Sequence, residues 1–563
     1  MHKSQVYSFV IILLLLSENI SGQAYNNQLF IPPVLSGNNF NLSFNASTRQ
    51  FFPGLTTDTY GINGDYLGPT LVFQKNDSVF INVTNNLFEV TSCHWHGLHV
   101  PALYDGGPHT TINPGTTWYA HFKVLNNAGT YWYHPHVHMN TLPQVNSGLA
   151  GMIIVKDSAE GLLNLPRTYG VDDFPVILQD KKYSISGQML ANALGDSMQV
   201  NGTIHPYLNC PAQIVRLRLL NGSNARVYNL GFSDQRNFYV IGNDGGLIDQ
   251  PYSTNRLLLA NGERVEILID LSVDTPGTSF ILKSFASEMA SDIPGAITGM
   301  MGGNGPLEAV DFNIMQLNVI TPTANPVLTV PVNLIPLSPW NPVNANRIRY
   351  KEVSGLGMVS GQGNFMMDNT TYDHMIINDT MRLGDIEIWN IANNSNMAHP
   401  MHIHDVQFYI LHRNGSGPGM YEKGLKDVVL VKPGETVSLI TKFEDFSDDS
   451  IPYMYHCHNL AHEDMGMMLQ FIVTSGTSGV GAIQNTDHTY IYPNPTSDYW
   501  QLQLNSYPEK VNLYNMQGEK VTTPIIISSS KMVSVGDSQL QPGIYILKIS
   551  YKERDISKTL VKY

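Results

Sequence analysis

The chain has 563 residues, a formal net charge of −14 and only 14% charged residues. Its length allows about four domains, and its negative charge argues against nucleic-acid binding, which needs a basic patch. Glycine (47) and proline (32) are frequent. The apolar runs are short and bounded by turn residues, which favours an all-β fold.

The first 22 residues have the pattern of a secretory signal. Lys3 is followed by an apolar run from Phe9 to Leu16 and then by the small residues Ser21 and Gly22. The run is too short to span a membrane, and the alternative is a buried first strand. No other segment could span a membrane, so the sequence predicts an exported protein without a transmembrane segment.

Further along, residues 81–84 and 215–219 alternate between apolar and polar side chains, the period of a β-strand. Three separate segments then carry pairs of histidines spaced by one residue. If such a segment is extended, both members of a pair point to one face. The segments are His94-Trp95-His96, His134-Pro135-His136 and His399-Pro400-Met401-His402-Ile403-His404.

The most specific segment lies near residue 457. Cys457 stands between His456 and His458, and His462 and Met467 follow. In an extended run Cys457 points to one face and its neighbours to the other. Cysteine, histidine and methionine together are the ligands of a blue-copper site, whereas zinc sites more often use several cysteines. A lone His-x-His pair can be accidental, but four such segments favour copper.

These segments resemble the ligand motifs of multicopper oxidases, the family of laccases, ascorbate oxidase, bilirubin oxidase and bacterial cuprous oxidases. The resemblance covers about residues 30–475 and includes Leu67-Gly68-Pro69-Thr70 and Asn243-Asp244-Gly245-Gly246. It implies three cupredoxin-like Greek-key β-sandwich domains at 27–160, 165–320 and 325–474.

The resemblance also implies four coppers per chain. A type 1 copper would be held by His399, Cys457 and His462, with Met467 as a weak axial ligand. A type 2 copper would be held by His94 and His402. The ligands of a binuclear type 3 pair would be His96, His134, His136, His404, His456 and His458.

Two carboxylates match acidic residues that the family uses near its oxygen-reducing copper cluster. Asp105 lies in Asp-Gly-Gly-Pro, and Glu463 directly follows His462. Reduction of O2 to water consumes four protons, and carboxylates are natural proton relays. The alternative is that Asp105 only forms a turn and that Glu463 is a surface charge.

The resemblance implies an oxidase that couples four one-electron oxidations of a substrate to reduction of O2 to water. The substrate stays open between phenols and copper(I). Methionines near the copper motifs favour copper(I), but Ser395 replaces the acid that cuprous oxidases have there. The alternative function is a copper-binding electron-transfer, copper-tolerance or scaffold protein without oxidase turnover. The methionines concerned are Met289, Met300, Met301, Met358, Met366, Met367 and Met397.

Cys93 and Cys210 are expected to be buried thiols, with a disulfide as the alternative in an exported protein. Residues 475–487 have the composition of a flexible linker. Residues 488–563 resemble the C-terminal sorting domain of the type IX secretion system, on the motifs Tyr492-Pro493-Asn494-Pro495 and Leu540-Gln541-Pro542-Gly543. The alternative is a small carbohydrate-binding or structural β-sandwich. The resemblance implies passage through the outer membrane with the type IX machinery as partner.

Overall fold

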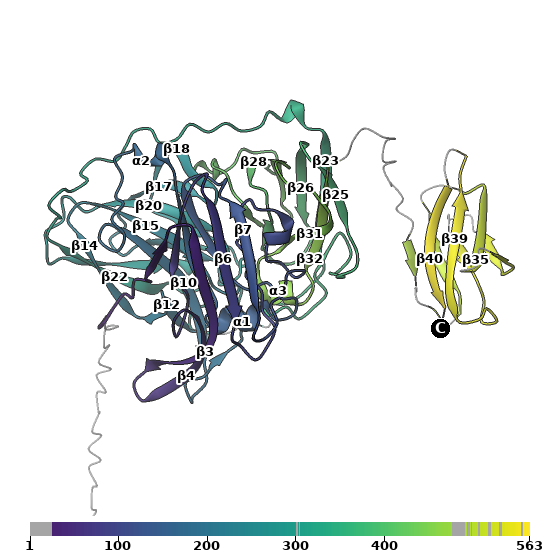
Figure 1. Cartoon of the computed structure of the whole chain (residues 1–563), viewed down its shortest axis with the longest axis horizontal. Coiled ribbons are helices and arrows are strands. Elements are labelled where there is room, and N and C mark those ends of the chain that lie inside the picture. Colours follow the sequence, from purple (N-terminus) through teal and green to yellow (C-terminus); the bar gives the residue numbers. More distant parts are fainter. Residues whose placement is uncertain are drawn as a thin grey trace, which may run out of the picture. The chain divides into compact units, whose positions relative to one another are not determined.

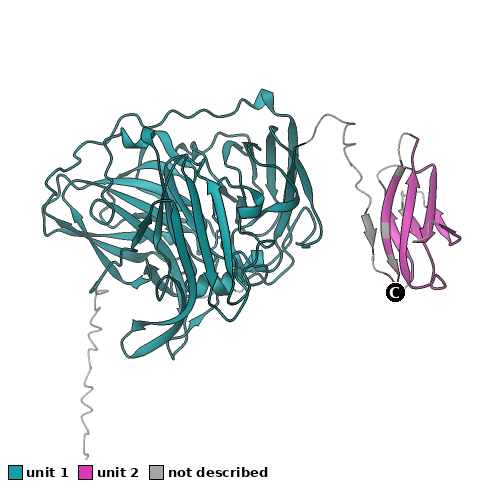
Figure 2. Cartoon of the chain, in the orientation of Figure 1, with its two compact units in different colours: residues 1–476 teal, residues 477–563 magenta. Residues whose placement is uncertain are grey.

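The computed structural model describes residues 25–475, apart from 300, 301, 303 and 304, and residues 490–562 with short gaps at 493–495, 497, 505–506, 516–518, 528–531 and 553–554. The chain divides into two compact units, residues 1–476 and 477–563 (Figure 2). The expected signal at 1–22, Met300, Met301 and all of the expected linker except residue 475 lie outside the described residues.

The prediction of an all-β fold is confirmed, because unit 1 is built from three β-sandwiches in chain order (Figure 1). In the first sandwich, the sheets have the strand orders β2, β5, β9, β8 and β4, β3, β6, β7. Ile81 and Val83 of β6 are fully buried between them, as their alternation predicted. The strands are β2 (Val34–Ser36), β3 (Asn39–Phe52), β4 (Leu55–Ile62), β5 (Thr70–Gln74), β6 (Ser78–Asn85), β7 (Thr117–Lys123), β8 (Gly129–Tyr133) and β9 (Gly151–Lys156).

The second sandwich has the strand orders β1, β14, β22, β21, β16, β19 and β13, β12, β10, β15, β20, β17, β18, with β11 beside β10. The strand β1, within the range expected for the first domain, pairs with β14 of this sandwich. The strands are β1 (Asn27–Gln28), β10 (Asp173–Tyr183), β11 (Met189–Leu190), β12 (Ser197–Val200), β13 (Thr203–Ile204), β14 (Pro206–Pro211), β15 (Ile214–Asn221), β16 (Tyr228–Phe232), β17 (Phe238–Asn243), β18 (Gly246–Thr254), β19 (Leu257–Leu259), β20 (Arg264–Asp270), β21 (Ser279–Ser284) and β22 (Phe312–Ile320).

Both faces of β15 are buried, although its residues alternate in polarity. Its apolar residues join the core of the second sandwich. Arg216 and Arg218 point the other way and are buried against Glu266, and Arg218 also pairs with Asp173 at 2.8 Å. Arg218 further donates to the hydroxyl of Thr130 in the first sandwich. The alternation therefore marks a strand between an apolar core and an ionic domain interface.

The third sandwich has the strand orders β24, β23, β26, β30, β28 and β25, β32, β31, β27, β29. Its core includes Trp389, Leu439 and Phe471, which come from both sheets. The strands are β23 (Arg347–Ser354), β24 (Met366–Met367), β25 (Asp379–Arg382), β26 (Ile386–Asn393), β27 (His399–Ile403), β28 (Phe408–Arg413), β29 (Val428–Val431), β30 (Thr436–Lys442), β31 (Asp448–Cys457) and β32 (Met468–Thr474).

Two short helices join the first and third sandwiches. The carboxylate of Asp464, the last residue of α3, accepts from the backbone N–H groups of Thr141 and Leu142 at 2.9 Å each, at the start of α1. The α-helices are α1 (Thr141–Ser147), α2 (Ser158–Gly161) and α3 (Leu460–Asp464), and the 3-10 turns are η1 (Ala102–Tyr104), η2 (Ala286–Glu288), η3 (Pro342–Asn344) and η4 (Met420–Glu422).

Unit 2 is a small sandwich with a core of its own that includes Trp500, Leu513 and Leu547. Its strand orders are β33, β34, β38, β37 and β36, β35, β39, β40. The strands are β33 (Tyr490–Tyr492), β34 (Trp500–Gln503), β35 (Lys510–Asn515), β36 (Lys520–Val521), β37 (Ile525–Ile527), β38 (Met532–Val535), β39 (Gly543–Ser550) and β40 (Asp555–Lys562).

Candidate metal centre

Strand pairing in the third sandwich sets two histidine segments against each other. The strands β27 and β31 are antiparallel, with His402 opposite His456 and Met401 opposite Cys457. Opposed residues in such a pair share a face, and successive residues point to opposite faces. His402 and His456 therefore lie on one side of the sheet and Cys457 on the other, as the sequence predicted for the His-Cys-His run.

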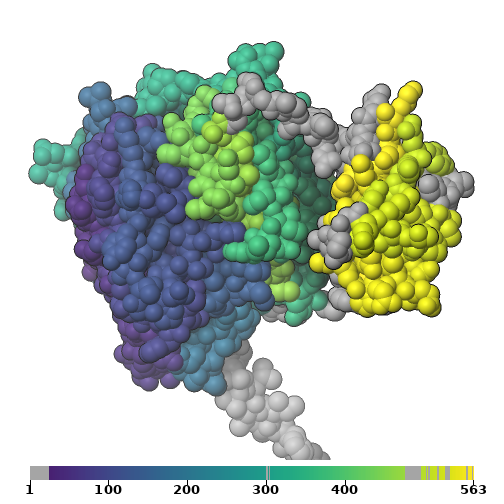
Figure 3. Space-filling model, turned by 45° about the vertical axis from the view of Figure 1, so that its right-hand side comes forward, coloured from purple at the N-terminus to yellow at the C-terminus, as the bar shows by residue number. Residues whose placement is uncertain are grey.

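The first sandwich supplies its histidines from the end of β8 and from the loop after β6. The backbones of His94 and His134 bond each other twice, with N···O distances of 2.8 and 3.1 Å. This bridge holds the two His-x-His pairs side by side. In the space-filling view the blue atoms of this part of the chain lie directly against the green atoms of the third sandwich (Figure 3). The histidines of both sandwiches meet at that interface.

Three side chains of the third sandwich form a buried triangle. The Cys457 sulfur lies 3.4 Å from Nδ1 of His399 and 3.6 Å from Nδ1 of His462, and the two nitrogens lie 3.2 Å apart. Metal–ligand bonds of about 2.0–2.3 Å separate neighbouring ligand atoms by roughly 3.3–3.7 Å. Two imidazoles and a thiol in a trigonal set are the ligands of a blue-copper site. Met467 is buried nearby, and its carbonyl accepts from the N–H of Cys457.

Six further histidines form two groups of three, which the sequence did not divide. In each group one ring nitrogen faces two others at 3.1–3.3 Å. Neutral imidazoles whose lone pairs point at one another repel. A cation between them would remove this repulsion. The groups are His96, His134 and His458, and His136, His404 and His456.

His94 and His402 differ from these six histidines in the hydrogen bonds of their ring nitrogens. Their Nε2 atoms are buried and have no hydrogen-bond partner. Their Nδ1 atoms donate to the backbone carbonyls of Asp105 at 2.9 Å and Asp427 at 2.8 Å. This fixes the tautomer, with the proton on Nδ1 and the lone pair on Nε2, as in histidines that bind metals. The donor sets of all these groups fit copper.

Burial keeps these rings neutral and able to donate their lone pairs. It lowers the pKa of His456 to about 3 and that of His462 to about 4. Burial also raises the pKa of the Cys457 thiol, so this sulfur needs a metal to lose its proton. Burial first, and then neighbouring histidines, hold the pKa well below its ordinary value in His96, His134, His136, His399, His402, His404 and His458.

Both predicted carboxylates are buried among the histidines. Oδ2 of Asp105 lies 2.9 Å from Nδ1 of His404. Glu463 lies with Oε1 3.4 Å from Nδ1 of His136 and Oε2 3.3 Å from Nδ1 of His456. Burial raises the pKa of Glu463 well above its ordinary value. A surface location for Glu463 is wrong, because its side chain is 2% exposed.

Sequence reasoning missed Asp427 and Arg264. Oδ1 of Asp427 lies 3.1 Å from Nε2 of His96, while its carbonyl holds His402. Arg264 of β20 donates to both carboxylate oxygens at 2.7 and 2.5 Å. Burial alone would lower the pKa of Arg264, but Asp427 and Asp244 raise it. An acid directly before the apolar run of β29 was the only signal for this pair.

A loop at 355–365 covers the triangle around Cys457. The carbonyl of Met358 lies 3.0 Å from Nε2 of His462. The ring of Phe365 packs against His399 at 4.8 Å and His462 at 4.6 Å. On the other side, the hydroxyl of Ser395 lies 2.9 Å from Nε2 of His399. Both imidazoles are therefore oriented from outside by hydrogen bonds.

Other predicted residues lie apart from these groups. Cys93 and Cys210 are free and buried, so the expectation of buried thiols is confirmed and the disulfide alternative is wrong. The methionines that bear on the choice between phenol and copper(I) as substrate differ in burial. Met367 and Met397 are buried, and Met289, Met358 and Met366 are half-buried. In the parts of the chain that are described, no helix is long and apolar enough to cross a membrane.

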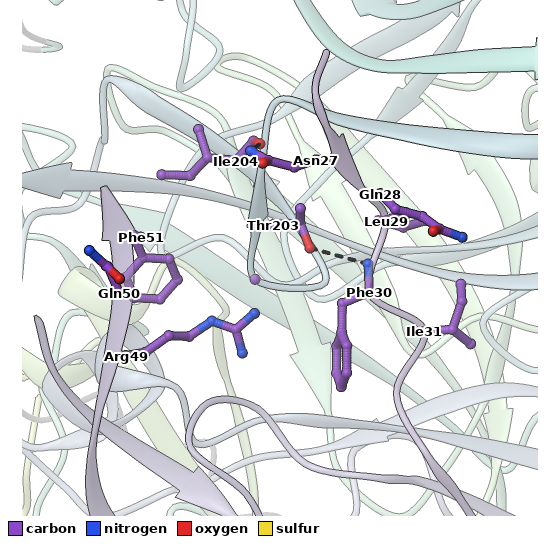
Figure 4. A pocket seen from close by; sticks show the side chains of 11 residues that line it. Asn27, Gln28, Leu29, Phe30, Ile31, Arg49, Gln50, Phe51, Thr203 and Ile204 are labelled. Atoms are coloured by element: carbon purple, nitrogen blue, oxygen red, sulfur yellow. Dashed lines mark hydrogen bonds between the residues drawn. The ribbon is translucent and has the colours of Figure 1, made fainter. Parts of the chain in front are cut away.

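A cavity of about 630 Å³ contains none of the candidate ligands (Figure 4). Residues 27–31, 49–51 and 202–204 line it. The guanidinium of Arg49 lies 5.5–6.0 Å from the ring centres of Phe30, Phe51 and Tyr66. Arg49 also pairs with Asp65 at 3.0 Å, so its charge already has a partner within the protein.

Comparison with known proteins agrees with the site. Three multicopper oxidase family models match residues 43–160, 173–300 and 349–477. A multicopper oxidase of Staphylococcus haemolyticus is 33% identical over 468 residues, 80% of this chain and 93% of that protein. The crystal structure of the McoA multicopper oxidase of Aquifex aeolicus superposes with a TM-score of 0.72 at 32% identity, over 80% of this chain and 100% of that one.

The chain therefore belongs to the multicopper oxidase family, whose members bind copper. A relative that is named for a different role is about as similar. The cell division protein FtsP of Sodalis glossinidius is 34% identical over 467 residues, 80% of this chain and 93% of that protein. Residues 490–563 match the secretion system C-terminal sorting domain. This match confirms the resemblance seen in the sequence and indicates export.

Proposed function

We propose that the protein is an oxidase that holds four coppers and couples substrate oxidation to reduction of O2 to water. The observation that carries the proposal is the pair of orphaned Nε2 atoms of His94 and His402 beside two groups of three facing imidazoles. Copper bound at these positions would supply one-electron oxidation at the Cys457 triangle and O2 reduction among the eight other histidines.

The proposal gives each segment a role. His399, Cys457 and His462 would hold the type 1 ion, with Met467 as a further, weaker ligand. His94 and His402 would hold the type 2 ion, and the two groups of three would hold the type 3 pair. The peptide backbone from Cys457 to His456 and His458 supports a short covalent path for electrons. Glu463, beside His136 and His456, would give protons to reduced oxygen.

Asp105 would act as a second proton relay or as an anchor. Its carbonyl orients His94 and its carboxylate contacts His404. It thus links a type 2 ligand with a type 3 ligand. The neighbouring Gly106 has φ +78°, and a Cβ there would lie 1.8 Å from the carbonyl oxygen of Cys93. The turn and the polar contact therefore support each other, and the two interpretations of Asp105 do not compete.

An organic reductant such as a phenol is the first candidate substrate. A pocket of about 170 Å³ adjoins the covering loop at Val359 and Ser360. Asp196 and Glu308 are among its described lining residues, and none of these is a methionine. Nε2 of His462 donates to the carbonyl of Met358 at 3.0 Å, which connects the loop with this ring. Electrons could enter along this hydrogen bond.

Copper(I) is the second candidate substrate, and the thioether of Met397 is the observation that favours it. Met397 lies two residues before His399 and is buried. Ser395, however, donates to the side-chain oxygen of Asn393 at 2.7 Å and provides no negative charge for a cation. Oxygen consumption by copper-loaded protein, with a phenol and with copper(I) in turn, separates the two.

A binding or scaffold role without turnover is the alternative, and similarity to cell division proteins is the observation behind it. Metal analysis with an optical spectrum decides between the functions. We expect four coppers per chain and an absorption band near roughly 600 nm from the Cys457 thiolate. Zinc in place of copper, or a colourless copper-loaded protein, would contradict the oxidase proposal.

We also propose that the type IX secretion machinery recognises unit 2 and carries the protein through the outer membrane. The support is the sorting-domain match and the separate core of this unit. Every candidate copper ligand precedes residue 468. Deleting residues 486–563 should leave copper content and specific activity unchanged, but should retain the protein in the periplasm of its native cell. Normal release of the truncated chain, or loss of copper, would contradict this role.

A further inference from the structure

Trp95 stands between two candidate copper ligands, because it separates His94 from His96 in the chain. Its side chain is completely buried in the core of the first sandwich. His94 is assigned to the type 2 ion and His96 to the type 3 pair, so short stretches of backbone connect this indole with both kinds of ligand. Neither the electron path through Cys457 nor the proton supply through Glu463 uses the ring of Trp95.

Trp118, Phe122 and Tyr133 pack around Trp95 at similar distances. The ring of Trp118 is stacked on that of Trp95, with an interplanar angle of 16° and centres 6.0 Å apart, a favourable geometry for aromatic pairs. Phe122 lies at 6.0 Å and Tyr133 at 6.1 Å. Indole and phenol rings lose one electron far more readily than the phenyl ring of Phe122. Trp118 and Tyr133 are therefore the neighbours that can pass an electron to an oxidised Trp95.

The surroundings of their protons distinguish these rings. An oxidised indole or phenol is a strong acid, and its oxidised form is stabilised when a base within hydrogen-bond reach takes the proton. Nε1 of Trp95 is buried and has no hydrogen-bond partner in the described part of the chain. The buried hydroxyl of Tyr133 donates to the carbonyl of Pro69 at 2.8 Å, and a carbonyl is a very weak base. Trp118 is only half-buried, so water can take its proton.

We propose that Trp95 and Trp118 form a route by which a one-electron oxidising equivalent leaves the eight histidines and reaches the surface of the first sandwich. The route rests on the proposed oxidase function and operates when the reducing substrate runs out. Trp95 gives one electron to partly reduced oxygen, Trp118 gives one electron to Trp95, and the indole proton of Trp118 passes to water. A thiol outside the protein then returns one electron and one proton to Trp118 and is itself oxidised.

The route protects the rings nearest the candidate ligands. Without Trp118, the oxidising equivalent stays at Trp95 or moves to Trp132, whose ring lies 4.1 Å from that of His134. Nε1 of Trp132 is also buried without a hydrogen-bond partner in the described part of the chain. Oxidation would then modify buried indoles beside the ligands and release copper.

Hydrogen peroxide is the probe that tests this route, because it supplies partly reduced oxygen without a reducing substrate. Copper-loaded full-length protein is treated with peroxide, frozen samples are examined for a tryptophan radical by electron paramagnetic resonance, and oxidised residues are located by peptide mass spectrometry. Trp118→Phe removes the oxidisable ring, whereas Trp118→Tyr replaces it with another oxidisable ring. Trp340→Phe removes a half-buried tryptophan elsewhere and is the matched control.

We expect wild type and Trp340→Phe to show the radical signal and to take up oxygen at Trp118. Trp118→Phe should lose this signal, take up oxygen at Trp95 and Trp132, and release copper several-fold faster. Its rate of substrate oxidation should equal that of wild type. Trp118→Tyr should restore copper retention and show a tyrosyl radical in place of the tryptophan radical.

Copper-free protein separates the route from simple exposure of Trp118, since this residue should then stay unoxidised by peroxide. Equal oxidation of Trp118 with and without copper would overturn the proposal, as would identical radical signals and copper release in wild type and Trp118→Phe. A copper-loaded protein that is colourless and consumes no O2 would overturn the proposed function, and this route with it.

Discussion

The triangle around Cys457 and the group of eight histidines are both buried metal sites, but they are built in different ways. The triangle comes from one sandwich, and Cys457 and His462 are five residues apart. The eight histidines come from two sandwiches and four segments, with His96 and His458 in one group. A site of local ligands depends on one domain, whereas a site at an interface depends on how two domains meet. Variants should therefore affect the two sites separately.

Replacing Cys457, which lies in the triangle and is joined by peptide bonds to two histidines of the other site, should have the largest effect. Cys457→Ser should abolish the blue absorption and reduce oxidase activity to background, because it removes both a ligand and the electron path. The eight histidines keep their places, so the type 2 and type 3 coppers should remain, as measured by copper content and electron paramagnetic resonance. Cys210→Ala, a buried thiol elsewhere, should stay blue and active. Retained turnover in Cys457→Ser would refute the electron path.

Glu463→Gln should affect only the interface site. It removes a proton donor but no ligand, so reduction of the type 1 copper by substrate should keep its rate. Reoxidation by O2 should slow by about 10²-fold, a typical effect of losing a general acid. Stopped-flow measurement of each half-reaction separates the steps, with Glu444→Gln, a half-buried carboxylate away from the histidines, as control. Unchanged reoxidation would leave Glu463 without a role in proton supply.

Asp427→Asn should weaken the interface site by a smaller amount. The side chain supports His96 and is itself held by Arg264. Loss of such support costs about 10–100-fold in metal affinity. Chelator competition should release type 2 and type 3 copper more easily while the blue band remains. Asp173→Asn, which disturbs a buried arginine pair away from the histidines, serves as control. Loss of the blue band first would reverse the assignment.

His99 offers the smallest and most specific test of the interface. It lies 2.7 Å from Asp405 and 3.1 Å from Asp445 of the third sandwich. Although burial lowers it, Asp405 and Asp445 raise the pKa of His99 to about 9. The unfolded value is about 6.5, so the stabilisation is complete below pH 6.5 and is lost as pH rises through 9.

His99→Gln should therefore lower Tm by about 2 °C at pH 6. The difference from wild type should vanish above pH 9, in thermal unfolding followed by circular dichroism. The variant His412→Gln should follow wild type across the range. A Tm difference that does not depend on pH would show that His99 acts through packing rather than charge.

The sequence predicted the residues of the site better than their grouping. The spacing of His456, Cys457 and His458 is enough to assign opposite faces, because a strand alternates strictly. The division of six histidines into two groups depends on how β8, β27 and β31 meet, which no local pattern specifies. Asp427 was missed for the same reason, since its partners His96 and Arg264 lie more than 160 residues away.

The sequence predicted the fold to about the same extent as the site. Period-two alternation identified β6 and β15, but it did not indicate that Arg216 and Arg218 would be buried. Their charges are satisfied by Glu266 and Asp173, which come from other strands. Alternation reports that two faces differ, whereas the burial of the polar face depends on the neighbouring domain.

The backbone bridge between His94 and His134 lies hundreds of residues before His456 in the chain. A partly synthesised or truncated chain can form this bridge but lacks the remaining imidazoles. Copper binding by the inner histidines therefore requires that the first and third sandwiches have both been synthesised and have packed together. Reactive oxygen chemistry would be withheld from immature chains by geometry alone, without an inhibitor or a dedicated chaperone.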